Sequence, residues 1–329
     1  MVNILIFRTD RIGDLLLTCP AIITIKKYFP NSKVSIVASE KNFHYAKNLH
    51  IFENVYLFPK KNIFKKIKFI YKISKLFFDY IYIFDGKERS IIASAFIKSK
   101  NKLSLATINK PYYKILNIKF FNDNKNESLN QIFQKFIDFT NIRSKINNYK
   151  FLNEKEDNKF SLNIPIKNYI HFHLDEKWID DLYIENYTSI NPSYNQLTSF
   201  FNTLAIKNNL LITTGIVDFD LLNLLINNFF KKINEKIFMK KCDKNNIYLV
   251  FKPTFNDIES ILRNTQTLIS CHGAITHAAN SFNVKSIDII EKGRSDFYNR
   301  FTEYLSNYYP IYRSNFDILS KDLINIVSK

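Results

Sequence analysis

Residues 4–22 read ILIFRTDRIGDLLLTCPAI, and this stretch decides the fold class of the chain. An apolar strand is expected to end at Phe7, and an apolar helix is expected to begin at about Asp14. The polar turn between them carries Arg8, Thr9, Asp10, Arg11 and Gly13. It has one glycine and no following GK[ST], so it is neither a dinucleotide-binding fingerprint nor a phosphate-binding P-loop. Strand, turn and helix in this order are typical of the βαβ units of parallel sheets.

The same alternation runs along the whole sequence. Short β-branched and aromatic runs predict strands at residues 2–7, 33–38, 54–58, 79–84, 102–106, 169–174, 210–214, 247–251, 266–270 and 285–290. Helical periodicity is clearest in ESLNQIFQKFIDFTNI, where the apolar positions are Leu129, Ile132, Phe133, Phe136 and Ile137. Further helices are expected near residues 195–207, 218–233, 255–263, 274–282 and 316–327.

Residues 143–163 form a polar stretch rich in Asn, Lys and Glu without a sustained period, and we place a domain boundary there. The predicted fold class is α/β, with two Rossmann-like, doubly wound parallel-sheet domains over residues 1–155 and 156–329. A length of 329 residues agrees with two domains, because it exceeds what a single core usually serves.

The chain has only five glycines, and each follows an expected strand and precedes the next helix. They are Gly13, Gly86, Gly215, Gly273 and Gly293. Glycine is favoured where the backbone needs a positive φ or where a ligand approaches closely, although it is also a common loop residue. These turns are expected at the carboxyl edges of the two sheets, where doubly wound folds bind ligands. Two such edges that face each other across a cleft would explain both sets of glycines.

A net charge of +17 suggests an anionic partner, either nucleic acid, a membrane surface or a phosphorylated substrate. The excess is mostly Lys in a chain that is also rich in Asn, Ile, Phe and Tyr, so compositional drift toward solvated lysines explains much of it. No RNP, zinc-finger or helix-turn-helix pattern is present, and we predict no nucleic-acid partner.

Cysteine usage indicates neither a disulfide framework nor a zinc site, because Cys19, Cys242 and Cys271 are widely separated and form no CxxC pair. Asp180 and Asp181 resemble a metal-binding pair only superficially, and no metal or other cofactor is predicted. No apolar run approaches the roughly 20 residues that span a bilayer, and the sequence opens with the strand-like MVNILIF in place of a secretory leader. A cytoplasmic protein is expected.

Asp14 falls in the first turn of the first expected helix, where backbone amides favour a carboxylate. Two interpretations remain open at this point. Asp14 is either an ordinary acid at a helix N-terminus or a general base that needs a substrate hydroxyl within hydrogen-bond reach.

The segment FRTDRIGDLLLTCPAI resembles the opening motif of the bacterial lipopolysaccharide heptosyltransferases, glycosyltransferase family 9. The matching residues are Arg8, Gly13, Asp14 and Pro20, and YFPNSKVSIVASEKN resembles the second strand of that family with its lead-in. The resemblance implies the GT-B fold, a nucleotide-sugar donor on the C-terminal domain and an acceptor near the N-terminal one. It also implies that Asp14 is the general base, with Arg8, Thr9 and Gly13 as substrate-binding neighbours.

The segment HFHLDEKWIDD resembles a donor-binding part of the same family. Lys177 matches the lysine that contacts the donor phosphates, although in this chain it is adjacent to Trp178. An ammonium group near a diphosphate leaving group is what sugar transfer without a metal requires, because negative charge develops there. A surface lysine beside Asp175 and Glu176 is an equally open interpretation.

In TLISCHGAITHAANSFNVKSIDII a strand leads through a glycine into a helix, whose N-terminal N–H groups favour phosphate. The family usually has Asp-Thr-Gly at this turn; here Cys and His replace Asp and Thr, and the loop is one residue longer. The resemblance implies a donor site that includes Cys271, His272, Gly273, Ala274, Thr276 and His277. Without the resemblance, His277 is a satisfied helix histidine and Cys271 a small buried residue.

Asp218 follows Gly215 and is expected to cap the next helix, from where it or Asp220 could meet the nucleotide. Thr254 and Asp257 have the spacing of a capping box, which is a structural feature.

Residues 60–78, KKNIFKKIKFIYKISKLFF, contain seven lysines and no acidic residue. Basic and aromatic side chains on one helix favour contact with anionic lipid, at about 1 kcal/mol for each Lys near such a surface. Alternatively, the lysines are merely solvated and a stripe of Ile67, Ile70, Tyr71 and Leu76 packs on the sheet.

Together these features predict an inverting, metal-independent glycosyltransferase. It would move heptose or a related sugar from a nucleotide diphosphate sugar such as ADP-heptose to a lipopolysaccharide core or other cell-surface glycolipid. Peripheral contact with anionic lipid at the inner face of the cytoplasmic membrane would bring it to that acceptor. The alternative is a non-catalytic nucleotide- or polyanion-binding protein with the same two-domain shell.

Overall fold

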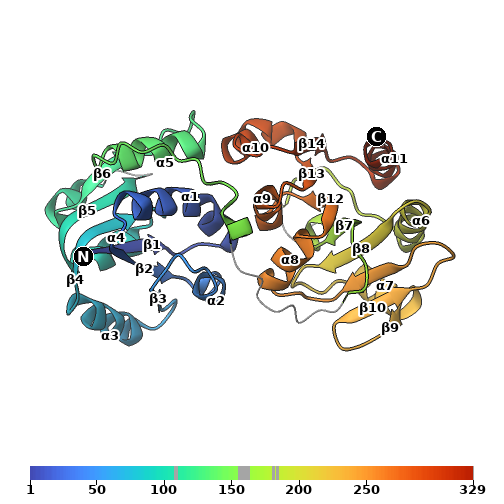
Figure 1. Cartoon of the computed structure of the whole chain (residues 1–329), viewed down its shortest axis with the longest axis horizontal. Helices are drawn as coiled ribbons and strands as arrows, with labels where there is room; N and C mark the ends of the chain where they lie inside the picture. The colour runs from blue at the N-terminus through green and yellow to red at the C-terminus, as the bar shows by residue number, and fades with distance from the viewer. Residues whose placement is uncertain (107–109, 155–163, 180–181, 183–184, 329) are drawn as a thin grey trace. The chain divides into compact units, whose positions relative to one another are not determined.

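The computed structural model describes residues 1–106, 110–154, 164–179, 182 and 185–328 (Figure 1). The chain divides into two compact units: residues 1–151 with 299–304, and residues 152–298 with 305–329. The expected domain boundary at residue 155 and the acid pair Asp180 and Asp181 lie outside the described residues.

Within the described part of the first unit, six strands form a parallel sheet. Their order is β3 (Asn54–Leu57), β2 (Ser32–Ala38), β1 (Val2–Arg8), β4 (Phe77–Ile83), β5 (Lys98–Ala106) and β6 (Lys119–Asn122). The helices are α1 (Ile12–Tyr28), α2 (Phe43–Lys47), α3 (Ile63–Ser74), α4 (Glu88–Ala95) and α5 (Leu129–Asp138). The strand order reverses between β1 and β4, and ligands of doubly wound sheets bind at such a reversal.

Helices cover both faces of this sheet (Figure 1). On one face, Phe136 of α5 meets the rings of Tyr82 and Phe84 edge-on. On the other face, Phe69 and Ile73 of α3 are buried against the strands. Helix α5 therefore buries the face that its sequence periodicity predicts.

The described strands of the second unit form a mixed eight-stranded sheet. Their order is β14 (Tyr308–Tyr312), β13 (Lys285–Ile290), β12 (Thr265–Cys271), β7 (Tyr169–Leu174), β8 (Asn209–Thr214), β11 (Ile247–Val250), β10 (Ile237–Lys240) and β9 (Lys231–Lys232). Among the described strands of this sheet, only β10 runs in the direction opposite to all the others. The helices of the second half are α6 (Tyr194–Ala205), α7 (Asp220–Asn228), α8 (Phe255–Leu262), α9 (Ala274–Ser281), α10 (Ser295–Thr302) and α11 (Phe316–Val327). Here the strand order reverses between β7 and β12.

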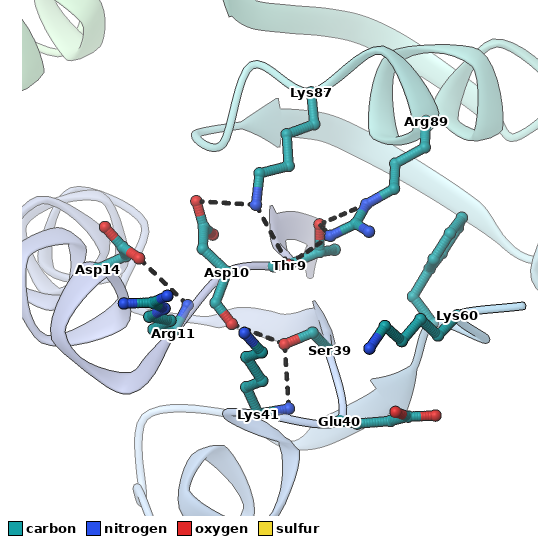
Figure 2. A pocket seen from close by; sticks show the side chains of 11 residues that line it. Thr9, Asp10, Arg11, Asp14, Ser39, Glu40, Lys41, Lys60, Lys87 and Arg89 are labelled. Carbon is teal, nitrogen blue, oxygen red and sulfur yellow. Dashed lines mark hydrogen bonds and ion pairs between the residues drawn. The ribbon is translucent and has the colours of Figure 1, made fainter. Parts of the chain in front are cut away.

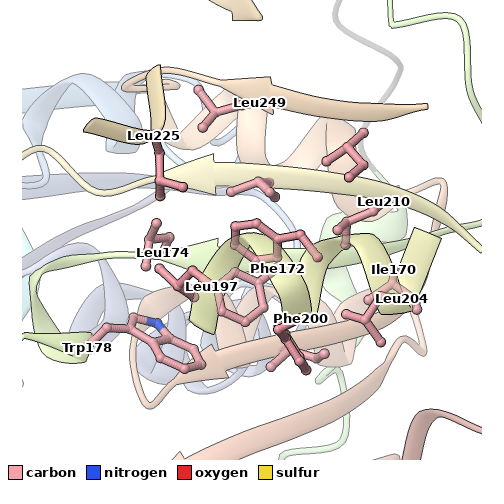
Figure 3. Close-up of a cluster of buried hydrophobic side chains, with 14 of the residues drawn as sticks. Ile170, Phe172, Leu174, Trp178, Leu197, Phe200, Leu204, Leu210, Leu225 and Leu249 are labelled. Carbon is pink, nitrogen blue, oxygen red and sulfur yellow. The ribbon is translucent and has the colours of Figure 1, made fainter. Parts of the chain in front are cut away.

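Aromatic side chains build the core of the second unit around β7 and α6 (Figure 3). Phe172 of β7 contacts both Phe200 of α6 and Trp178. Trp178 is fully buried and donates its indole N–H to the carbonyl of His173 at 2.8 Å. The turn that follows β7 is therefore anchored to the core by its tryptophan.

Each of the ten strands predicted from the sequence is present, with ends shifted by up to four residues. The strands β6, β9, β10 and β14 and the helix α10 were not predicted. The helix predicted over residues 218–233 is too long, because α7 ends at Asn228 and Lys231–Lys232 pair with β10 in a hairpin. Strand β14 contains Pro310, which an edge strand tolerates because its missing N–H faces no partner strand.

Candidate active site

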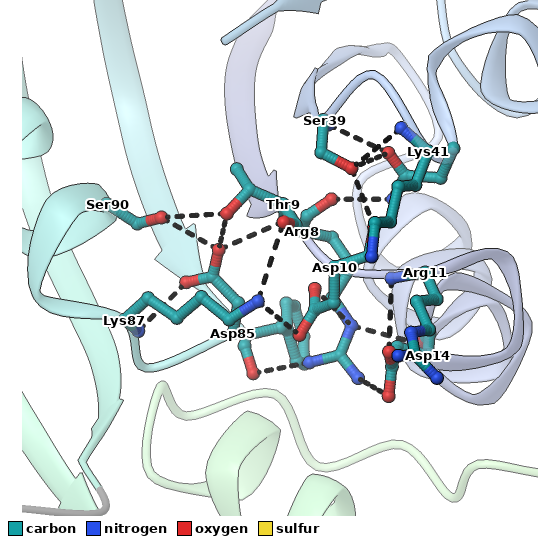
Figure 4. A network of polar contacts seen from close by, with 12 residues as sticks. Arg8, Thr9, Asp10, Arg11, Asp14, Ser39, Lys41, Asp85, Lys87 and Ser90 are labelled. Atoms are coloured by element: carbon teal, nitrogen blue, oxygen red, sulfur yellow. Dashed lines mark hydrogen bonds and ion pairs between the residues drawn. The ribbon is translucent and has the colours of Figure 1, made fainter. Parts of the chain in front are cut away.

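The turns after β1 and β4 meet because these strands pair in parallel, with Phe7 opposite Ile83. Thr9 and Asp85 each lie two residues after this pair. The hydroxyl and the main-chain N–H of Thr9 donate to Asp85 Oδ2 at 2.6 and 3.0 Å (Figure 4). Ser90 donates to the same oxygen at 2.7 Å. Asp85 is enclosed, and burial together with the nearby charge of Asp10 raises the pKa of its carboxyl group. Partly buried hydrogen bonds thus join the two turns.

Arg8 stabilises the same turns from inside the unit. Its guanidinium donates to the carbonyl of Phe84 at 2.8 Å and to the carbonyl of Asp14 at 3.0 Å. It also lies 3.6 Å from a carboxylate oxygen of Asp10 and 3.7 Å from one of Asp14 (Figure 4). Only 5% of Arg8 is exposed, and Thr9 is buried as well. Both residues, expected to bind substrate, therefore use their side chains within the protein to position the turn.

Asp14 lies in the first turn of α1, which begins at Ile12, so that Gly13 is inside the helix and not before it. Its Oδ2 accepts the main-chain N–H of Arg11 at 3.1 Å, and 36% of its side chain is exposed. The helix N-terminus and the Arg8 guanidinium lie beside this carboxylate. An accessible carboxylate of this kind can accept a proton from a bound hydroxyl group.

A pocket of about 560 Å³ lies beside Asp14 in the first unit (Figure 2). Its lining residues are Thr9, Asp10, Arg11, Asp14, Ser39, Glu40, Lys41, Phe58, Lys60, Lys87 and Arg89. Cations outnumber carboxylates in this lining. Lys87 Nζ is 3.5 Å from a carboxylate oxygen of Asp10, whereas the ammonium groups of Lys41 and Lys60 make no ion pair with any described residue. The pocket therefore suits a polar ligand that carries negative charge.

Sequence reasoning did not assign the pocket residues Asp10, Ser39, Lys41, Lys87 or Arg89 a functional role. A signal for them exists, because each lies within a few residues of the carboxyl end of β1, β2 or β4, which are neighbours in the sheet. Arg89 donates to the carbonyl of Thr9 at 2.6 Å and so links α4 to the first turn.

Three turns meet at the carboxyl edge of the second sheet. Strand β7 pairs with β12, with His173 opposite Ser270, and with β8, with Leu174 opposite Thr214. The turn after β7 therefore lies between Gly215 and Gly273. A Cβ on Gly215 would be 2.9 Å from the Cβ of Asp175, and one on Gly273 would be 3.0 Å from Lys177 Nζ. Both glycines permit this close approach.

Lys177 occupies a short 3-10 turn at Glu176–Trp178. Its ammonium group donates to Asp175 Oδ2 at 2.7 Å, and Asp175 Oδ1 accepts the main-chain N–H of Lys177 at 3.2 Å. The side chains of Asp175 and Lys177 are both largely buried, which excludes the interpretation of Lys177 as a solvated surface lysine. The ammonium group is held at Gly273, directly before the N-terminus of α9.

His272 is fixed by a buried acid. Its Nδ1 lies 2.7 Å from Asp288 Oδ2, and Tyr308 donates to the same oxygen at 2.9 Å. The hydroxyl of Thr276 donates to the other Asp288 oxygen at 3.2 Å. The Nε2 of His272 has no hydrogen-bond partner among the described residues, and part of the His272 ring is exposed. The Asp288 contact fixes Nδ1 as the protonated nitrogen and leaves Nε2 for a ligand.

The remaining predicted donor residues lie deeper. Cys271 is buried at the end of β12, where Arg313 lies 3.7 Å from its sulfur, and burial raises the pKa of its thiol. His277 is also buried, and desolvation lowers its pKa well below the ordinary value. Gly273 is the N-cap of α9 and Ala274 its first residue, so this segment offers main-chain N–H groups more readily than side chains.

The expected capping role of Asp218 is wrong. The N-cap of α7 is Phe219, and the exposed Asp218 carboxylate instead accepts from Lys252 Nζ at 2.6 Å. Lys252 adopts a positive φ of 45° directly after β11, which brings it to the turn after β8. The capping box of Thr254 and Asp257 is confirmed.

Two histidines of β7 share one hydroxyl group in the interior of the second unit. His171 Nε2 and His173 Nδ1 lie 2.7 and 2.8 Å from the hydroxyl of Thr213. Desolvation lowers the pKa of His171 well below its ordinary value and that of His173 to about 4. Both rings are therefore neutral at physiological pH, and His173 Nε2 lies 3.7 Å from the Asp175 carboxylate.

Among the described residues, no group of three or more His, Cys, Asp or Glu side chains is arranged to hold a metal ion. Within the same residues, none of the helices combines the length and apolar character that crossing a membrane requires.

The fold of the chain, with its two doubly wound sheets, is similar to that of solved structures over nearly the whole chain. Escherichia coli heptosyltransferase WaaC with ADP-2-deoxy-2-fluoro heptose is 12% identical, with a TM-score of 0.67 and coverage of 99% of each chain. A family 9 glycosyl transferase from Veillonella parvula is 9% identical, with a TM-score of 0.69 and coverage of 98% of this chain and 91% of that one. The chain has the GT-B fold.

Sequence comparison alone does not reach these proteins, since no protein-family model and no curated protein matches the chain. The GT-B fold also includes a UDP-GlcNAc 2-epimerase from Methanocaldococcus jannaschii, which is 12% identical with a TM-score of 0.55 over the whole of this chain and 92% of that one. The heptosyltransferase resemblance predicted from the sequence is thus confirmed at the level of the GT-B fold.

Proposed function

We propose that this GT-B protein is an inverting glycosyltransferase that transfers heptose or a related sugar from a nucleotide diphosphate sugar to a cell-surface glycolipid. The observation that carries the proposal is that each unit has a site at its own reversal point: an accessible carboxylate in a cationic pocket in the first unit, and a held ammonium group before a helix N-terminus in the second. Solved heptosyltransferases of the same fold hold ADP or an ADP-heptose analogue, which supports a nucleotide-sugar donor.

Asp14 is the proposed general base. As the acceptor hydroxyl attacks the anomeric carbon, its proton passes to an Asp14 oxygen and a new C–O bond forms with inverted configuration. The bond between the anomeric carbon and the diphosphate oxygen breaks, and the electron pair stays with the diphosphate. Arg8 serves this step by holding the carboxylate and the carbonyl of Asp14 in place.

The leaving diphosphate gains negative charge, and the second unit offers donors to it. Lys177 supplies an ammonium group, and α9 supplies main-chain N–H groups from Gly273 onward. His272, whose Nδ1–H is held by Asp288, offers Nε2 as a hydrogen-bond acceptor for a hydroxyl group of the donor. The His-for-Thr difference from the family pattern therefore replaces a hydroxyl group, which can donate, with a ring nitrogen that accepts.

The acceptor is proposed to place an anionic group in the pocket of the first unit. Lys41 and Lys60 are the proposed contacts, because their ammonium groups are not neutralised by any described carboxylate. The acceptor hydroxyl then lies toward Asp14, which lines the same pocket.

The test is transfer of labelled sugar from ADP-heptose, and from other nucleotide sugars in parallel, to lipopolysaccharide precursors of increasing length. We expect label in the glycolipid fraction with the wild-type protein and its loss with Asp14→Ala. Nucleotide-sugar binding without transfer to any acceptor would instead establish the non-catalytic nucleotide-binding protein. Transfer undiminished in Asp14→Ala would remove Asp14 from the mechanism.

A further inference from the structure

Helix α3 carries an apolar stripe that the fold leaves uncovered. The residues Ile63, Phe64, Ile67 and Tyr71 are 60%, 78%, 57% and 63% exposed. At about 100° per residue these four positions fall within an arc of about 100°. The buried positions Phe69 and Ile73 lie on a different arc, which faces the sheet. The sequence-based expectation that Ile67 and Tyr71 pack on the sheet is therefore wrong.

A row of lysines runs along the other side of this stripe. On the same helical projection, Lys65, Lys68, Lys72 and the C-cap residue Lys75 occupy the arc next to the exposed apolar residues. Lys75 Nζ lies 4.2 Å from the centre of the Tyr71 ring, at the border of the two rows. No acidic residue occurs between Glu53 and Asp79. Helix α3 thus has three faces. One is buried against the sheet, the second is apolar and exposed, and the third carries the lysines.

The structure assigns this surface, the α3 face of Ile63, Phe64, Ile67, Tyr71 and the adjacent lysines, to docking on an anionic lipid bilayer. Charge complementarity selects this occupant, since a lysine row without counter-charges is attracted to anionic headgroups while exposed aromatic and aliphatic side chains enter the interface. A contiguous set of exposed apolar side chains on a protein surface marks an interaction site.

The position of α3 in the chain connects docking to the candidate active site. Lys60 and Phe58 line the pocket beside Asp14, and α3 begins only three residues after Lys60. A lipid-linked acceptor in the bilayer would therefore present its polar headgroup to the pocket while its acyl chains stay in the membrane. This link rests on the proposed function, whereas docking itself does not.

The α3 face can be changed without disturbing the fold. The side chain of Asn62 caps the helix by accepting the N–H of Lys65 at 3.1 Å, and Phe69 and Ile73 supply its packing. The exposed residues contribute to neither feature. Variants of them should keep the wild-type Tm, which thermal unfolding verifies before any binding measurement.

The test is co-sedimentation of the full-length protein with vesicles of phosphatidylcholine alone or mixed with phosphatidylglycerol. We expect binding only to the anionic vesicles, weakened by salt, and reduced at least about tenfold by the triple variant Lys65→Glu, Lys68→Glu, Lys72→Glu. The matched control reverses Lys207, Lys244 and Lys321, which are exposed in the second unit, and should bind as the wild type does.

A second pair of variants tests the apolar stripe. Phe64→Gln with Ile67→Gln should reduce binding to anionic vesicles several-fold at high salt, where screened lysines contribute least, whereas Ile206→Gln with Ile216→Gln, both exposed in the second unit, should not.

Three outcomes would overturn the assignment. The first is equal binding to neutral and anionic vesicles, and the second is equal effects of the α3 and control variants. The third is preference for a different occupant: self-association lost in Phe64→Gln with Ile67→Gln, or RNA bound in preference to vesicles. Retained ADP binding and vesicle docking without sugar transfer would contradict the proposed function alone.

Discussion

The two candidate sites lie at equivalent points of two doubly wound sheets, yet they treat charge differently. In the first unit, Asp14 is accessible and the ammonium groups of Lys41 and Lys60 are not neutralised by described carboxylates. In the second unit, Lys177 is held by a buried Asp175, and His272 by a buried Asp288. The first arrangement leaves charge for a ligand to neutralise. The second fixes its ammonium group and its imidazole in place before a ligand arrives, as preorganised sites do.

The substitution with the largest expected effect on this difference between the two sites is Asp14→Asn. Replacing the proposed base should lower the rate of sugar transfer by about 10²–10⁴-fold, the usual contribution of a general base, while leaving the affinity for ADP unchanged. Glu40→Gln is the matched control, because Glu40 is another carboxylate of the same pocket. Equal loss in both variants would show that the pocket needs negative charge and not a base at Asp14.

The corresponding change in the second unit is Lys177→Met, which keeps the length of the side chain and removes its charge. We expect a loss of about 10²–10³-fold in kcat/KM and weaker ADP binding by calorimetry, because Asp175 then faces the diphosphate without its cation. The control is Lys252→Met, which breaks the exposed pair with Asp218 and should cost less than about threefold. Unaltered ADP affinity in Lys177→Met would separate Lys177 from the donor.

The buried histidines of the second unit predict loss of stability in acid. The pKa of His173 is about 4 in the folded protein and 6.5 when unfolded, so the unfolded chain binds more protons between these values. The contribution of His173 to the free energy of unfolding should therefore be fully present above pH 6.5 and fall by about 3 kcal/mol as the pH approaches 4. His171 and His277, whose pKa values are also lowered, act in the same direction.

Fluorescence of Trp178 measures this loss in the second unit, because it is the single tryptophan and is buried beside His173. His173→Gln should make the free energy of unfolding less dependent on pH, because the contribution of the His173 imidazole is removed. In the first unit, Asp85 has a raised pKa and acts in the opposite direction, since its protonated form is favoured by folding. A profile that is flat in the wild type, or equally steep in His173→Gln, would contradict the neutral-histidine interpretation.

The smallest expected effect concerns Gly86, at the turn that carries Lys87. Its φ is +56°, and a Cβ would lie 2.7 Å from the carbonyl oxygen of Leu105. Gly86→Ala should lower the free energy of unfolding by about 1–3 kcal/mol, measured by urea denaturation. Gly293→Ala is the control, because nothing lies within 4 Å of a Cβ there. Similar losses in both variants would show that the close contact at Gly86 relaxes.

Sequence patterns were most reliable where the chain is buried and periodic. The apolar spacing of α5 and the β-branched runs of the inner strands predict their elements because burial on one or both faces constrains the residue types. Edge elements escaped prediction: β6 and β9 are short, β14 contains Pro310, and α10 has a polar composition. Such segments depend on a neighbouring strand or helix for their hydrogen bonds or packing, which local sequence does not record.

The sequence by itself determined the two-unit α/β fold, the positions of Asp14 and Lys177 at strand ends, and the resemblance to GT-B heptosyltransferases. Only the tertiary structure decided what each side chain does there: Arg8 supports the turn from inside, Asp218 pairs with Lys252, Asp288 orients His272, and the α3 stripe faces outward. The physical reason is that strand and helix periods follow from local steric and apolar patterns, whereas hydrogen bonds between turns join residues far apart in the sequence. Thr9 and Asp85, for example, are 76 positions apart. Their partners are set by strand order and register, which appear only when the sheet is assembled.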